Sequence, residues 1–170
     1  MNLADTLIAC TRLAIDEPAL DVRWIDQTSA WLDDERNVTI RSLGWRGLGV
    51  DDVRLTTEGS VDVRETVHGV RVFRAQFLIG TTNHDPESDA PAIADRIRAG
   101  FHRSDVGALL ESANLAAPAW DPVVSAPMRG DNANTRSVAV LEGRFNASRT
   151  LRGALIPAIV AARTPVRVLP

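Results

Sequence analysis

The sequence predicts an α+β domain with a mostly antiparallel sheet, a long β-hairpin and helices packed on one face. Two observations support this fold class. Period-2 alternation of apolar residues, typical of half-buried strands, recurs between residues 22 and 82. Helical periodicity appears before these strands and again after them, so helices and strands are grouped rather than strictly alternating. Such grouping favours α+β over a parallel α/β fold.

Composition sets the outer limits of this prediction. The chain has 170 residues, of which 45% are hydrophobic, and this is enough for one domain with a real core. The single cysteine, Cys10, excludes an intrachain disulfide and a Cys-rich zinc site, and its apolar neighbours predict a buried thiol. No apolar run reaches the roughly 20 residues of a membrane span, and we expect assembly in the cytoplasm.

The first element is a predicted helix with Leu3 and Leu7 on one face. Asn2 or Asp5 is suited to its N-terminal end, and Pro18 lies beyond its expected end. Strands are then predicted at residues 22–25 and 37–43, separated by a loop around Trp31. Three glycines follow the second strand and indicate bulges or a turn: Gly44, Gly47 and Gly49.

A long hairpin is the clearest β signal. Residues 61–64 and 70–79 both alternate, and His68-Gly69 between them is the expected turn because glycine supplies the positive φ of tight hairpins. The arms are predicted to reach from Leu55 to Thr82.

Two helices and further strands are expected after the hairpin. The first helix starts at Ser88 or Asp89, and Ser104 is the expected cap of the second, with Asn114 at its end. Residues 120–125 and 138–147 are predicted strands on either side of a polar loop at 128–135. We therefore place one domain at residues 1–148 and an extended, proline-containing C-terminal arm at 149–170.

No pattern in the sequence points to catalysis. The three histidines are far apart in sequence, and the acidic pairs Asp33-Asp34 and Asp51-Asp52 are expected in solvated loops. The glycine cluster lacks the Lys-Ser/Thr of a phosphate-binding loop. We expect no catalytic residue, no cofactor and no metal site.

Interface residues are the more promising candidates. Tryptophan and arginine are enriched at the centres of protein interfaces, and Trp31 and Trp45 stand in loop-like contexts beside charged residues. We assign the candidate subunit interface to Trp31, Trp45, Arg136, Pro157 and Pro165.

The order of these segments resembles the phage neck terminator and tail-completion (tail terminator) proteins. Trp24-Ile25-Asp26-Gln27 resembles the W-x-D-Q signature that follows the first helix of that family. The strand at 37–41, the long hairpin and the helix pair follow in the same order. Asn134-Thr135-Arg136 and the strand after it look like the family's closing D/N-T-R element. The resemblance covers roughly residues 3–148.

This resemblance implies a virion protein that assembles into a ring, usually a hexamer, at the top of the tail tube. The implied partners are further copies of the chain, the tail tube protein and the head-completion or adaptor proteins of the neck. DNA would pass through the lumen without specific binding, which agrees with a net charge of −3 and scattered arginines.

Other functions remain open at this stage. A head-completion or adaptor protein of the neck would also form a ring but would bind the portal. A ligand-binding α+β domain would be a monomer or dimer with a buried pocket. A small hydrolase would lose its activity on substitution of His84 or Asp85.

Overall fold

The computed structural model describes residues 2–18, 20–25, 36–58, 62–82, 85–129 and 135–157. Two compact units form. Unit 1 contains Met1–Arg46 and Val72–Ala147, and unit 2 contains Gly47–Arg71 and Ser148–Pro170. Three long strands contribute residues to both units.

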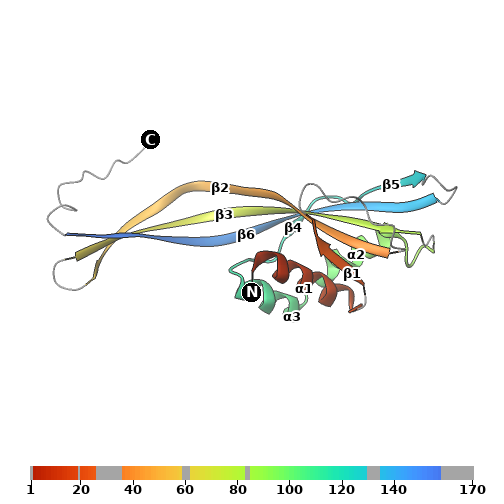
Figure 1. Cartoon of the computed structure of the whole chain (residues 1–170), viewed down its shortest axis with the longest axis horizontal. Coiled ribbons are helices and arrows are strands. Elements are labelled where there is room, and N and C mark those ends of the chain that lie inside the picture. Colours follow the sequence, from red (N-terminus) through yellow and green to blue (C-terminus); the bar gives the residue numbers. More distant parts are fainter. Residues whose placement is uncertain are drawn as a thin grey trace. The chain divides into compact units, whose positions relative to one another are not determined.

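The α+β fold class is confirmed: the sheet is mostly antiparallel, and the helices of unit 1 lie on one side of it (Figure 1). The elements in chain order are α1 (Leu3–Ile15), β1 (Asp21–Trp24), β2 (Arg36–Glu58), β3 (Asp62–Thr81), α2 (Ala90–Gly100), α3 (Ser104–Ser112), β4 (Ala119–Trp120), β5 (Val124–Arg129) and β6 (Thr135–Pro157).

The sheet has the strand order β1-β2-β3-β6-β4, and β5 also pairs with β6. β1 is parallel to β2, with Asp21 opposite Asn37 and Trp24 opposite Ile40. β4 and β5 are antiparallel to successive parts of β6. The parallel β1–β2 pair was not predicted from the sequence.

Side-chain contacts give the direction of the three long strands. Asp51 of β2 contacts Arg71 of β3, and Thr56 contacts Thr66, so the two strands run in opposite directions. Arg74 of β3 contacts Glu142 of β6. Gly80, later in β3, faces Arg136, earlier in β6, so this pair is antiparallel as well.

Local chemistry explains the helix ends. The Asn2 side chain accepts a hydrogen bond from the Asp5 amide and caps α1, and Asp89 caps α2 in the same way. The prediction that Ser104 caps α3 was wrong. Arg103 occupies the cap position without a side-chain hydrogen bond, and Ser104 is the first helical residue. Asn114 follows α3 with a φ of 56°, as expected of a helix stop.

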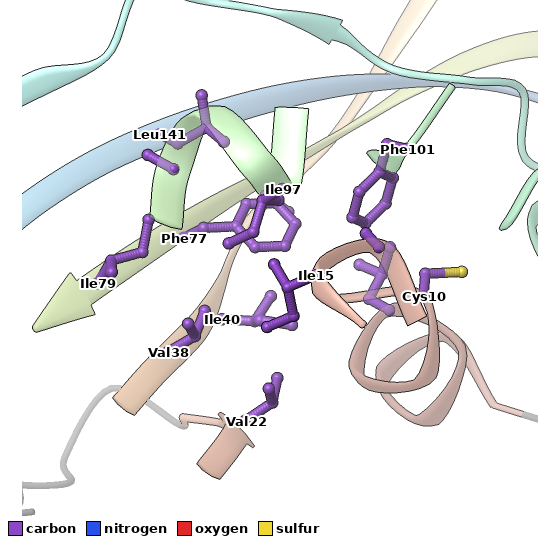
Figure 2. Close-up of a cluster of buried hydrophobic side chains, with 14 of the residues drawn as sticks. Cys10, Ile15, Val22, Val38, Ile40, Phe77, Ile79, Ile97, Phe101 and Leu141 are labelled. Carbon is purple, nitrogen blue, oxygen red and sulfur yellow. The ribbon is translucent and has the colours of Figure 1, made fainter. Parts of the chain in front are cut away.

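The hydrophobic core lies between the three helices and the sheet of unit 1. Figure 2 shows Val38 and Ile40 of β2 pointing toward Ile15 of α1 and Ile97 of α2. Aromatic rings extend this core, because Phe101 lies 5.2 Å from Trp120 and 6.1 Å from Phe145 between ring centroids. These contacts hold the helices on their face of the sheet through apolar burial.

The predicted turn at His68-Gly69 is wrong, because β3 continues through both residues. Gly69 has no positive φ. A Cβ atom there would lie only 2.5 Å from Arg71 Nη1, and closer still to Asp51 Oδ1. The glycine makes room for that ion pair, and the connection between β2 and β3 falls at residues 59–61, outside the described residues.

Three other boundaries also differ from the predictions. The strand predicted at 37–43 does not end there: β2 continues to Glu58 through the three glycines, which were expected to mark bulges or a turn, and Gly44 has a φ of +96°. β5 extends to Arg129 and β6 begins at Thr135, so every residue of the predicted loop at 128–135 either is strand or lies outside the described residues. β6 does not end near residue 147 but continues to Pro157, past the expected start of the C-terminal arm.

Candidate interaction surface

Trp45 lies in β2 immediately after Gly44 and is 43% exposed. Its ring is tilted against that of the buried Phe73, with 5.0 Å between centroids. Trp24 stacks on the same phenylalanine, at 6.4 Å. Trp45 is therefore anchored on the core by part of its ring and presents the rest to solvent, and its role at an interface stays a prediction.

Arg136 lies near the start of β6 with its guanidinium over Gly80 of β3. A Cβ atom at residue 80 would be 2.8 Å from Arg136 Nη2, so the glycine provides the space that this half-buried arginine fills. Gly80 and Phe73 are seven residues apart on β3, or about 23 Å along an extended strand. The alternation of side chains places them on opposite faces. The fold does not bring Arg136 and Trp45 together.

The side chains of the other three predicted interface residues are not described. Trp31 and Pro165 lie outside the described residues. Pro157 is the last residue of β6, and only its backbone is described.

Unit 2 has an arrangement that the sequence did not predict. β2, β3 and β6 form a three-stranded sheet there, with β3 in the centre. Arg71 binds Asp51 through two hydrogen bonds of 2.6 Å, which join β2 to β3. This hydrogen bonding, with the charge of the guanidinium, lowers the pKa of the Asp51 carboxyl. The expectation that Asp51-Asp52 lies in a loop was wrong, because both residues belong to β2.

Among the residues that the structure describes, the outer strands of unit 2 have open edges. β1 pairs only with residues 37–40 of β2. The partners of β6 on its outer side, β4 and β5, reach no further along it than Arg144, and an isolated bridge joins Leu115 to Ala147. Within the described residues, no strand pairs with the outer edges of β2 and β6 in unit 2. Apolar side chains on β2 are about half exposed, namely Leu48, Val53 and Leu55.

The face of unit 1 away from the helices carries paired charges. Glu142 accepts hydrogen bonds from Arg74 and Gln76, each at 2.9 Å. Arg144 pairs with Asp121 at 2.8 Å. Each of these two guanidinium groups therefore faces a carboxylate, which reduces the positive charge that it offers to nucleic-acid phosphates.

The candidate reactive groups are separate from one another. Cys10 is fully buried between helices, and burial raises the pKa of its thiol to about 12, so it stays protonated near neutral pH. His68 lies within β3 and His102 just after α2, while His84 is outside the described residues. Within the part of the chain that the structure describes, no three His, Cys, Asp or Glu side chains gather in a way suited to a metal ion.

Comparisons with known proteins add little to this geometry. No family model matches the chain, and no curated protein matches it. Among solved structures, a chain from the "Virion of native gene transfer agent (GTA) particle" is 14% identical. The alignment covers 85% of this chain and 98% of that chain, with a TM-score of 0.29, too low to define a shared fold.

Among the described helices, none is both long and apolar enough to cross a bilayer.

Proposed function

We propose that this chain is a structural virion protein of a tailed phage or phage-derived particle, which forms a ring that ends the tail tube and joins it to the neck. One observation carries the proposal. The segments that resemble the tail terminator family follow the order α1, β1, the β2–β3 hairpin, α2 and α3, and then β6. Trp24, which opens the W-x-D-Q segment, is the last residue of β1, and β1 is the element that follows α1.

A structural role also suits the distribution of apolar groups. A ring subunit needs surface that is buried only on assembly, and β2 carries exposed apolar side chains beside an open strand edge. The proposed role involves no catalytic step, cofactor or membrane. The proposed partners are further copies of the chain, the tail tube protein and a head-completion protein.

The decisive experiment is native mass spectrometry of the purified chain, alone and with tail tube protein, with negative-stain images of the same samples. We expect closed rings, with six subunits if the family pattern holds, and binding to the end of the tail tube. A chain that stays monomeric with every tail and neck partner contradicts the proposal. Rings that bind the portal and not the tail tube would instead identify a head-completion protein.

The proposal includes a lumen through which DNA passes without being gripped. The net charge of −3 and the ion pair between Arg74 and Glu142 support weak phosphate contact. We expect no measurable binding of duplex DNA to the assembled ring at physiological salt in a fluorescence anisotropy titration. Strong, salt-dependent binding by the ring would contradict this part of the proposal.

A further inference from the structure

We propose that the chain assembles by adding the β6 edge of one copy to the β2 edge of the next, within unit 2. This inference deepens the proposed ring, because it names the surfaces that hold the subunits together. The partner is a second copy of this chain, and the contact is a continuous sheet formed between copies.

The first argument is the pattern of strand pairing. No described strand of unit 2 pairs with the outer edge of β2 or of β6, so each edge presents a row of backbone amide and carbonyl groups. Such edges readily accept another strand, and this form of recognition gains main-chain hydrogen bonds. The two edges lie on opposite sides of the same three-stranded sheet, so each copy offers one edge to each neighbour.

The second argument is charge. Residues 47–58 of β2 contain three carboxylates and one guanidinium, a net charge of −2. Asp51 is neutralised by Arg71 of β3, which leaves a charge of −1 on the strand. Residues 148–157 of β6 contain two arginines and no acid, a net charge of +2. The two edges are therefore complementary, whereas pairing β2 with β2 or β6 with β6 would bring like charges together.

The direction of the strands decides the geometry of this contact. β2 and β6 are both antiparallel to β3, so they run in the same direction. When the sheet is extended from one copy to the next, β6 pairs in parallel with β2 of its neighbour. Because different surfaces meet, the interface is heterologous, the type that closes into a ring when the rotation between copies allows it. A two-fold dimer would need like edges.

Two exposed side chains allow a direct test. Asp52 of β2 has a side-chain exposure of 54%, and Arg152 of β6 is also exposed. We expect Asp52→Arg and Arg152→Asp each to remove the ring at a concentration where the unmodified chain is fully assembled, as seen by native mass spectrometry. The double variant, Asp52→Arg with Arg152→Asp, restores opposite charges across the interface and should recover the ring.

Matched controls separate the interface from general damage. Asp95 of α2 is 64% exposed and pairs with Arg98, as Asp52 pairs with Arg54, so Asp95→Arg makes the same charge change in unit 1. It should leave assembly unchanged. Arg54→Gln removes the local partner of Asp52 without reversing the charge of that carboxylate, and it should also keep the ring. Circular dichroism checks that every variant is folded.

Hydrogen exchange provides a second, independent measurement. Amides in residues 47–58 and 148–157 should exchange at least tenfold more slowly in the ring than in the monomer. If both charge reversals still form rings and these amides gain no protection, edge pairing is wrong while the proposed function stands. If the amides are protected only after tail tube protein is added to a monomeric chain, the occupant is that protein and self-pairing is overturned. A chain that forms no ring and binds no tail partner overturns both proposals.

Discussion

Two helical glycines in the same unit differ sharply in their surroundings. A Cβ atom at Gly100 of α2 would lie 2.6 Å from the Ala14 Cα atom and closer still to its carbonyl oxygen, so the backbones of α1 and α2 touch there. A Cβ atom at Gly107 of α3 would meet nothing within 4 Å. We expect Gly100→Ala to destabilise the chain by about 1–3 kcal/mol or more, because backbone cannot yield cheaply. Gly107→Ala should stabilise it by about 0.5–1 kcal/mol.

Thermal and urea unfolding of these two variants measure the difference. If Gly100→Ala lowers the free energy of unfolding and Gly107→Ala raises it, the close packing of α1 on α2 accounts for the loss of stability in Gly100→Ala. Equal effects of Gly100→Ala and Gly107→Ala would contradict the helix contact at Ala14.

The ion pair between Asp51 and Arg71 predicts a pH dependence that is local to unit 2. Hydrogen bonding to Arg71 lowers the pKa of Asp51, so the stabilisation is present above the unfolded pKa of about 3.9 and is lost as the pH falls below it. At pH 7 we expect Asp51→Asn to speed hydrogen exchange in residues 47–58 and 62–71. The difference in exchange rate between the variant and the unmodified chain should shrink as the pH falls from 7 through the lowered pKa of Asp51. The control is Asp52→Asn, which should have a smaller effect at pH 7.

The same ion pair explains why the turn prediction failed. Glycine beside histidine in a polar stretch resembles a hairpin turn, and no local pattern distinguishes that role from the one Gly69 has. Its role depends on Asp51, eighteen residues away on another strand. The positions of glycines can be read directly from a sequence. The close approach of side chains to a glycine on another strand can be recognised only once the register of the strands is known.

At the scale of elements, the signals that succeeded were local. Asn2 and Asp89 cap the two helices they were expected to serve, and alternation located β1 and the core of β2. The parallel pairing of β1 with β2 and the full length of β6 depend on distant partners, so periodicity did not reveal them. The loop between β5 and β6 was overestimated because Met128 and Arg129 pair with β6 despite their polar surroundings.

The aromatic cluster is an element-scale test of the core. Phe145 of β6 is fully buried and lies near Phe73, Phe101 and Trp120, with centroid distances of 6.1–6.2 Å. We expect Phe145→Ala to lower the free energy of unfolding by about 3–5 kcal/mol. Val124→Ala on β5, where the side chain is 64% exposed, should change it by less than about 0.5 kcal/mol. Urea denaturation compares the two, and a small loss in Phe145→Ala would contradict the assigned packing.

At the scale of the whole molecule, the apolar core is unevenly divided. Every member of the buried hydrophobic cluster belongs to unit 1, and the described part of unit 2 contributes none. Unit 1 ends at Ala147, although the β6 strand itself continues to Pro157. The candidate strand edges were not predicted, because an aromatic residue such as Trp45 can be noticed in a sequence, whereas an open edge can be recognised only when the strand pairing is known.

This division predicts the behaviour of a chain shortened to residues 1–147. Unit 1 keeps all of its buried hydrophobic cluster and should retain its helical circular dichroism and a cooperative unfolding transition. The remaining part of unit 2, residues 47–71, is a two-stranded hairpin without a core, and such hairpins are marginally stable in water. Its amides should therefore exchange quickly. Because the β6 edge is absent, we expect the shortened chain to be monomeric in size-exclusion chromatography coupled to light scattering, whereas we expect the full chain to form a ring. A shortened chain that still forms rings would place the subunit contacts in unit 1, and one that is unfolded would show that unit 1 depends on unit 2 for its stability.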